Sequence, residues 1–440
     1  TVFFEQDPFI QPELLIKKTV DTELNLSTLP PNSSLEDYIN QAIVHKDWNE
    51  LEQLLDKYRQ ADSYDHILYE YGLGALYRFQ GKQKKAIEMY KQIIKNNPNL
   101  HYPRFDLSMM LFEDKQYNEA KSEFEIVRPF LPTQIQGLID QLLTTMKKSQ
   151  DWQPTVNFNF EKTDNVNQSS NIKEISIGDA TFIRDEESLP KKAKGLGYTL
   201  NASREKNMMS NHYAYFSATF NGINYWDNKD YSEQTIRIDT GYKYKDLKQS
   251  FGIIPFIGQN ILGNSRYSNN YGTGLEYNRL LSNRLQVSAN TTHIQKRYQD
   301  SSLAQYYDGH SNSQAALVMY QPKSQLLIYS GLDWLQDRLA DQAESSNRQG
   351  IRSGFLYFGE SLGISGNIRY SQRNFLADNI WYGIHRKDNE YELGVAAWRK
   401  QWQWKGFTPK LNYRYQKIDS NLPLYERNNS TFFMTIDKIF

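Results

Sequence analysis

Hydrophobic positions follow two different periods along the chain, and the change between them lies near Asp151. Before this point, apolar residues recur three and four positions apart, as Leu138 and Leu142 do, which is the spacing of one helix face. Beyond it, apolar and polar residues alternate, as around Phe158 and Phe160, which is typical of β-strands. The sequence therefore predicts a helical front part and a larger β-strand part.

Composition supports three segments. Residues 1–34 contain four prolines and no clear period, so we predict an extended leader there. Residues 35–150 are expected to form a helical domain, and residues 151–440 a β-domain. The glycine count rises from 4 in residues 1–150 to 20 in the rest of the chain, as turns between many strands require.

A 34-residue repeat organises the helical part. Positions that match at this spacing include Ala86 and Ala120, Tyr90 and Phe124, and Pro98 and Pro132. A period of 34 with small residues at helix contacts and proline after the second helix is typical of tetratricopeptide repeats. We predict two such repeats over residues 67–100 and 101–134, a degenerate pair before them and a closing helix after them.

The first helix of each pair lines the concave face of such a stack, where peptides bind. By register, this face would form a client-binding groove from Leu68, Tyr71, Arg78, Phe79, Tyr102, Phe105, Met109 and Phe112. Its apolar character suits an unfolded segment. The alternative is that several of these side chains pack against neighbouring repeats or the leader.

Turn spacing divides the β-domain into fourteen strands. Tight turns are expected near Met208, Asp246, Asn283, Pro322, Glu360 and Trp404. Longer polar loops, including residues 259–270 and 374–388, lie between them. Strands are expected to start near residues 154, 194, 211, 233, 249, 271, 284, 309, 324, 346, 362, 388, 407 and 430.

Short turns on one side and long polar loops on the other are typical of an outer-membrane barrel. We therefore predict tetratricopeptide repeats followed by a 14-stranded antiparallel transmembrane β-barrel. A soluble β-sandwich is the alternative, because it can show the same alternation.

Charge and motifs exclude several function classes. Lys+Arg and Asp+Glu number 51 each, so there is no field to attract nucleic acid. Mean hydropathy is −0.72, and no run of about 18 apolar residues predicts a membrane helix.

Gly359–Gly363 matches G-x-S-x-G, but it joins two strands instead of a strand and a helix, so Ser361 is not expected to be catalytic. We expect no enzyme activity, cofactor or metal site.

Several barrel segments resemble those of the Slam family, the surface lipoprotein assembly modulators of Gram-negative bacteria. The segments are Tyr225–Tyr231, Tyr267–Gly272, Tyr382–Asp388, and Gly406–Lys410 with Asp419–Asn421. The resemblance spans about residues 35–440. It implies delivery of lipoproteins from the periplasm to the cell surface by an outer-membrane protein whose helical domain is periplasmic.

The resemblance also implies partners. These are a surface lipoprotein client and outer-membrane lipid, with a periplasmic chaperone or the barrel-assembly machinery as further candidates; we expect a monomer. Two other functions remain open. An exopolysaccharide export porin would usually carry a longer repeat array, and a passive nutrient channel would not need a peptide-binding domain.

Moving a polar chain with its acyl anchor poses a physical conflict. The polar lumen would hydrate the chain, whereas the acyl chains favour lipid. We expect a lateral seam between the first and last strands, because no covalent hairpin joins them. Its candidate residues are Phe158, Phe160, Phe432 and Met434. Phe158 is expected to lie close enough to Met434 for a disulfide crosslink.

Overall fold

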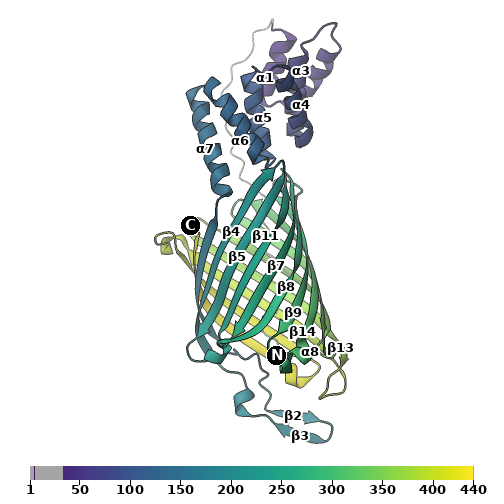
Figure 1. Ribbon diagram of the computed structural model, residues 1–440, viewed down its shortest axis with the longest axis vertical. Coiled ribbons are helices and arrows are strands. Elements are labelled where there is room, and N and C mark those ends of the chain that lie inside the picture. Colours follow the sequence, from purple (N-terminus) through teal and green to yellow (C-terminus); the bar gives the residue numbers. More distant parts are fainter. Residues whose placement is uncertain (1–3, 5–32, 440) are drawn as a thin grey trace.

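The computed structural model describes Phe4 and residues 33–439, and shows a helical stack above one rim of a closed β-barrel (Figure 1). The predicted leader therefore lies outside the described residues except for Phe4, Ser33 and Ser34. Phe4 lines the barrel lumen, where its ring centroid is 5.8 Å from that of Tyr267.

Three antiparallel helix pairs and a closing helix form the stack. They are α1 (Leu35–His45), α2 (Trp48–Arg59), α3 (His66–Phe79), α4 (Gln83–Asn96), α5 (His101–Glu113), α6 (Tyr117–Val127) and α7 (Thr133–Ser149). This confirms the predicted repeats, the degenerate first pair and the final helix.

Small residues at the repeat positions let paired helices touch. A Cβ on Gly74 would lie 2.3 Å from the Tyr90 ring, so α3 and α4 approach through the missing side chain. Ala86 and Ala120 are fully buried at equivalent positions, beside Tyr90 and Phe124. The 34-residue spacing is therefore a packing requirement of the helix contacts.

Fourteen strands close the barrel in sequence order, with β16 beside β1. They are β1 (Gln153–Thr163), β4 (Ala193–Met209), β5 (His212–Tyr225), β6 (Glu233–Lys245), β7 (Gln249–Leu262), β8 (Ser265–Leu280), β9 (Leu285–Tyr298), β10 (Gly309–Lys323), β11 (Leu326–Leu339), β12 (Ser346–Phe358), β13 (Leu362–Asp378), β14 (His385–Arg399), β15 (Thr408–Ser420) and β16 (Arg427–Ile439). The predicted strand number and order are confirmed.

One predicted loop is wrong. Residues 259–270 do not form a long connection, because β7 runs to Leu262 and β8 starts at Ser265 instead of near residue 271. Gly263 and Asn264 have φ of 58° and 91°, and two consecutive positive φ values permit a two-residue type I′ hairpin. The polar residues that suggested a loop belong to the paired strands.

The connection between β1 and β4 was not anticipated as a structured element. It contains the hairpin of β2 (Glu174–Ile177) and β3 (Ala180–Ile183), which projects from the end of the barrel away from the helices (Figure 1). A short helix, α8 (Ser301–Tyr307), lies in the loop after β9.

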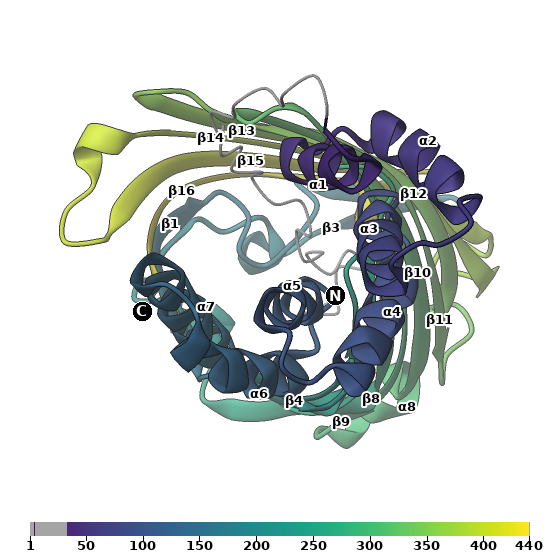
Figure 2. The same cartoon turned by 90° about the horizontal axis from the view of Figure 1, so that it is seen from above.

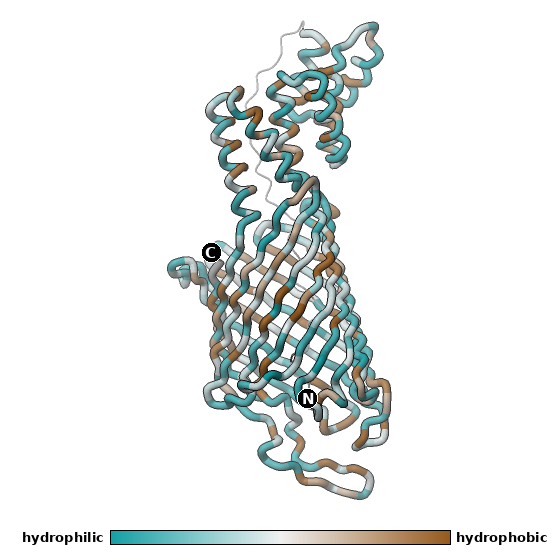
Figure 3. The backbone as a smooth tube through the Cα atoms, viewed as in Figure 1, coloured by the Kyte–Doolittle hydropathy of each residue, from teal (hydrophilic) through white to brown (hydrophobic). Residues whose placement is uncertain are grey.

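The barrel exterior is apolar and its interior polar. Figure 3 shows apolar residues interspersed with polar ones along the strands. Large apolar side chains that point outward and remain exposed include Ile238, Ile257, Leu332, Ile351 and Ile368. Such a surface is stable in lipid, where every backbone polar group pairs with a neighbouring strand. Among the described helices, none is long and apolar enough to span a membrane.

Two tight turns of the barrel hold the helical stack. Asp114, 1% exposed, accepts from the Leu247 backbone N–H through Oδ1 (3.2 Å) and from the Asn211 amide through its carbonyl (2.7 Å). The Asn118 backbone N–H donates to Asn207 Oδ1 (3.0 Å), and the Asn207 backbone N–H donates to Gln150 Oε1 (2.8 Å). The repeats are thus docked onto the β4–β5 and β6–β7 turns.

The strands at the seam, β1 and β16, pair from Thr155 and Ile439 to Thr163 and Thr431. Phe160 lies opposite Met434, whereas Phe158 lies opposite Ile436. The expected Phe158–Met434 crosslink is therefore wrong by two residues, because pairing register depends on contacts between distant strands that periodicity does not specify.

Replacing Asp114 with alanine is expected to loosen the docking of the helices. Leu247 would lose its hydrogen-bond acceptor, so its amide should exchange on the order of tenfold faster in hydrogen–deuterium exchange. Glu119→Ala is the matched control, since Glu119 makes only an exposed ion pair with Lys91. Equal protection of Leu247 in Asp114→Ala and the parent would contradict this role.

The seam register predicts which cysteine pair can form. Directly opposite residues in antiparallel strands have Cα atoms about 4.5–5.5 Å apart, within disulfide range, while diagonal ones are about 7–8 Å apart. Phe160→Cys with Met434→Cys should crosslink under mild oxidation, and Phe158→Cys with Met434→Cys should crosslink poorly. Gel mobility of the oxidised proteins measures both; the reverse order would disprove the register.

Candidate functional site

Three features of the molecule can act on a polypeptide: the concave face of the helices, the barrel lumen and the seam. Seen from above, the helices follow part of the barrel rim, and α1 and α5 lie inside α2 and α6, above the opening (Figure 2). The first helices of these pairs therefore face the space that leads into the lumen.

The predicted groove residues do not share one environment. Tyr71, Phe105, Met109 and Phe112 are partly buried against the core of the repeats, and Leu68 packs against the core of the first pair. Phe105 contacts Phe124 edge-on at 6.2 Å, and Phe112 stacks on Tyr117 at 5.6 Å. These side chains pack the repeats together.

Two aromatic side chains of the predicted groove remain open to solvent. Phe79 is 60% exposed at the end of α3, where it stacks on Trp48 at 5.0 Å between ring centroids. Tyr102 is 58% exposed in the first turn of α5. Since their removal leaves the core intact, they are the groove residues best suited to contact another chain.

Polar contacts connect α3 to α5 along the inner face of the stack. The Tyr71 hydroxyl donates to Asp106, and Arg78 pairs with Glu113, its Nε lying 3.1 Å from Oε2. Burial raises the pKa of both Tyr71 and Asp106, while the Tyr71 hydrogen bond and Arg78 oppose the rise at Asp106. Tyr71 therefore stays a neutral donor, and the contacts lock adjacent repeats together.

The lumen carries rows of arginines and carboxylates on β11–β15 and β1. Arg369 Nη2 lies 3.2 Å from Asp333 Oδ2, and Arg414 Nη2 lies 3.7 Å from Glu161 Oε1. Asp333 is only 1% exposed, and Arg348 and Arg369 are the cations that face it. A second cluster joins Lys243 to Glu205 at 2.6 Å on the opposite wall.

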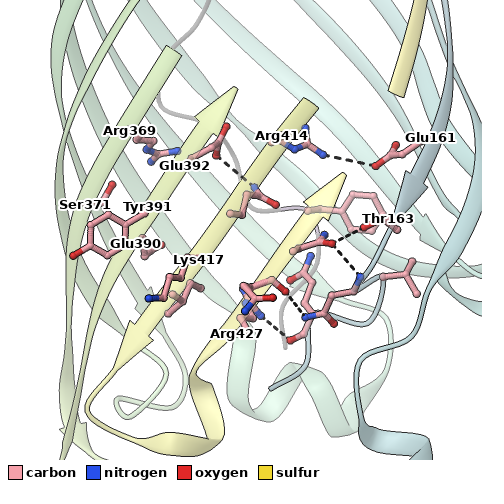
Figure 4. A pocket seen from close by; sticks show the side chains of 18 of the residues that line it. Glu161, Thr163, Arg369, Ser371, Glu390, Tyr391, Glu392, Arg414, Lys417 and Arg427 are labelled. Atoms are coloured by element: carbon pink, nitrogen blue, oxygen red, sulfur yellow. Dashed lines mark hydrogen bonds and ion pairs between the residues drawn. The ribbon is translucent and has the colours of Figure 1, made fainter. Parts of the chain in front are cut away.

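Arg369, Arg414 and Glu161 line a cavity of about 550 Å³ in the lumen (Figure 4). Figure 4 shows Arg369, Glu392, Arg414 and Glu161 projecting into it from separate strands. Polar side chains from several walls can form hydrogen bonds with a peptide backbone, whereas moving acyl chains from lipid into this polar space would be unfavourable.

The seam has different lumen and lipid faces. On the lumen side, Thr163 Oγ1 donates to Asn429 Oδ1 at 2.8 Å, and Asn157 donates to Asp437. On the lipid side, the predicted residues Phe158, Phe160 and Phe432 are exposed and Met434 is partly buried. The seam is therefore closed by ordinary strand pairing with few side-chain bonds.

Sequence patterns found the strands that form the lumen, but not the ion pairs. Arg369, Glu392 and Arg414 alternate with apolar residues along β13, β14 and β15, and they line the lumen. The clusters join residues from strands far apart in sequence, so spacing carried no signal for them. The anchoring residues Asp114 and Asn211 were also missed, because turn polarity does not reveal a partner.

No arrangement in the described part of the chain points to catalysis. Ser361 lies in the turn between β12 and β13, where its carbonyl accepts the Lys400 backbone N–H at 3.0 Å. Over Phe4 and residues 33–439, no group of three His, Cys, Asp or Glu side chains could hold a metal ion.

Comparison with known proteins identifies relatives along nearly the whole chain. The chain is 28% identical over 424 residues to a surface lipoprotein assembly modifier of Pasteurella multocida, covering 91% of this chain and 81% of that one. It is 25% identical to surface lipoprotein assembly modifier 1 of Haemophilus influenzae, covering 91% and 83%. It is also 25% identical to the hemophilin secretion modulator of Acinetobacter baumannii, covering 98% and 90%.

Two family models also match. The one described as surface lipoprotein assembly modifier covers residues 152–440, the barrel, and the one for that family's N-terminal TPR repeats covers residues 22–124. The resemblance seen in the sequence is thereby confirmed. Since the first match alone covers well over half of the chain, this protein belongs to the surface lipoprotein assembly modifier family.

Proposed function

We propose that this protein is an outer-membrane translocator that delivers lipoproteins from the periplasm to the cell surface. One observation supports this proposal above all: in a chain of this family, a stack of tetratricopeptide repeats is docked directly above a barrel whose outer face is apolar. Repeats of this type bind peptides. Its family is one of assembly and transport, and is not a known enzyme family.

The helical domain would lie in the periplasm. It sits at the end of the barrel that carries the tight turns at residues 209–212 and 245–249, and outer-membrane barrels keep their short turns on the periplasmic side. The proposal includes domain boundaries near residues 35 and 151, which are supported by the start of α1 at Leu35, the end of α7 at Ser149 and the start of β1 at Gln153.

The client would first meet the helical groove and then the lumen or the seam. Phe79 and Tyr102 offer apolar contacts to an unfolded segment, and the lumen offers polar ones. The acyl anchor would travel in lipid along the seam of Phe158, Phe160, Phe432 and Met434, because burial of each CH₂ contributes about 0.8 kcal/mol. Folding of the client outside would make export irreversible.

The alternatives are less well supported. Neither an exopolysaccharide porin nor a passive channel accounts for the family match together with a docked repeat domain. The client is a lipoprotein in this proposal, and a periplasmic chaperone or the barrel-assembly machinery would be further partners of a monomeric translocator.

Removing the two exposed groove aromatics tests client capture. Phe79→Ala with Tyr102→Ala should weaken binding of an unfolded lipoprotein about tenfold, as expected for exposed aromatic anchors, without loss of helicity. Ile126→Ala with Leu138→Ala, on α6 and α7, removes similar apolar surface elsewhere on the stack. Pull-down and circular dichroism measure both properties, and unchanged capture would refute the groove.

Locking the seam tests the acyl path. Once Phe160→Cys and Met434→Cys are oxidised, surface display of a lipoprotein, scored by external protease, should fall at least about tenfold and recover with reductant. Ala316→Cys with Leu332→Cys is the matched control. These residues lie directly opposite each other on β10 and β11, so their disulfide crosslinks two strands away from the seam and should leave display intact. Normal display with a complete Phe160–Met434 crosslink would exclude seam opening.

A further inference from the structure

An apolar groove crosses the seam on the outer face of the barrel. Its volume is about 450 Å³, and it spans β15, β16, β1 and β4 next to the loop after β5. Its large apolar side chains are Phe160, Leu411, Phe432, Met434 and Trp226, and its two cations are Lys162 and Lys194. The groove therefore bridges both sides of the junction that has no covalent hairpin.

The two lysines lie directly opposite each other at the end of the strands away from the helical stack. Lys162 on β1 is the register partner of Lys194 on β4. Both are exposed, and both lie on the lipid-facing side with Phe160 and Leu196. Like charges in directly opposite positions are destabilising, so this arrangement calls for a shared anion.

The protein itself provides little counter-charge there. In the described residues, neither lysine ammonium has an ion-pair or hydrogen-bond partner. Glu161 points into the lumen toward Arg414, and Asp227 accepts from the Lys194 backbone N–H at 2.9 Å. Arg297, at the same end of the barrel, instead donates to the Gly309 carbonyl at 3.0 Å. The Lys162–Lys194 pair is thus available to an external anion.

We propose that this groove binds lipid A of the outer leaflet, with one of its phosphates between the Lys162 and Lys194 ammonium groups and its acyl chains over Phe160, Phe432 and Leu411. A phosphate with up to two negative charges matches two adjacent ammonium groups, and the apolar lining matches hydrocarbon. Exposed Trp226 at the same level is typical of the membrane interface.

The choice of lipid A rests on the proposed function, because that places the end away from the helices in the outer leaflet. A lipid in this groove contacts Phe432 on one side of the seam and Phe160 on the other. It therefore holds the two strands together, and it has to leave or shift before an acyl anchor can pass between them.

Lipid binding can be measured on the full-length protein in detergent, without any client. In native mass spectrometry titrated with diphosphoryl lipid A, Lys162→Gln with Lys194→Gln should weaken binding roughly thirtyfold, the effect of two basic residues near an anionic headgroup. Lys162→Arg with Lys194→Arg should retain binding, since it keeps both charges. Lys206→Gln with Lys323→Gln, exposed lysines elsewhere on the barrel, is the matched control.

The outcomes distinguish the lipid site from the proposed function. Unshifted gel mobility before heating shows that each variant has a folded barrel. Undiminished lipid A binding by folded Lys162→Gln/Lys194→Gln would overturn the site, and equal competition by phosphatidylglycerol would overturn lipid A as its occupant. If the parent protein binds lipid A normally but does not support lipoprotein display, that result would count against the proposed function and leave this site standing.

Discussion

Strand pairing across β1 and β16 is the constraint on which the structure depends. In lipid, each backbone N–H and C=O must find a partner within the protein, so fourteen strands have to close on themselves. Thirteen of these junctions join strands that follow one another along the barrel, whereas β1 and β16 meet from opposite ends of the domain. The same hydrogen bonds that close the barrel therefore include one junction, between β1 and β16, that no covalent hairpin spans.

Much of this architecture was predictable because it follows from local periodicity. The helix pairs repeat every 34 residues because small residues such as Gly74 and Ala86 must lie where larger neighbours pack against them. Apolar and polar residues alternate along each strand because one face of the strand contacts lipid and the other faces the lumen. The hairpin at Gly263 and Asn264 was missed because polar strand residues around it look like a loop, although a Gly-Asn pair at positive φ is itself a turn signal. The seam register and the lumen ion pairs depend on distant strands, so no local pattern contains them.

The candidate groove also shows that a local sequence pattern does not contain tertiary contacts. Register placed eight residues on the first helices of the repeats, and the structure has them on α3 and α5. The repeat register cannot distinguish a side chain that packs against the core of the repeats, as Phe105 does, from one that is exposed to solvent, as Tyr102 is. That distinction depends on how neighbouring helices cross, and it decides which residues a client could contact.

The docking contacts link the helical stack to one side of the seam. Gln150, one residue past α7, accepts the Arg204 Nε–H of β4 through its carbonyl at 2.8 Å, and β1 starts three residues later. Asp114 and Asn118 contact the turns on the same side of the barrel. Any force on the helices is therefore transmitted to β1 and, through the β4–β5 and β6–β7 turns, to β4–β7, while β16 pairs with β1 and β15. Tilting of the stack would reach β16 through its pairing with β1 on one side of the barrel, whereas on the other side it would have to pass through β8–β15.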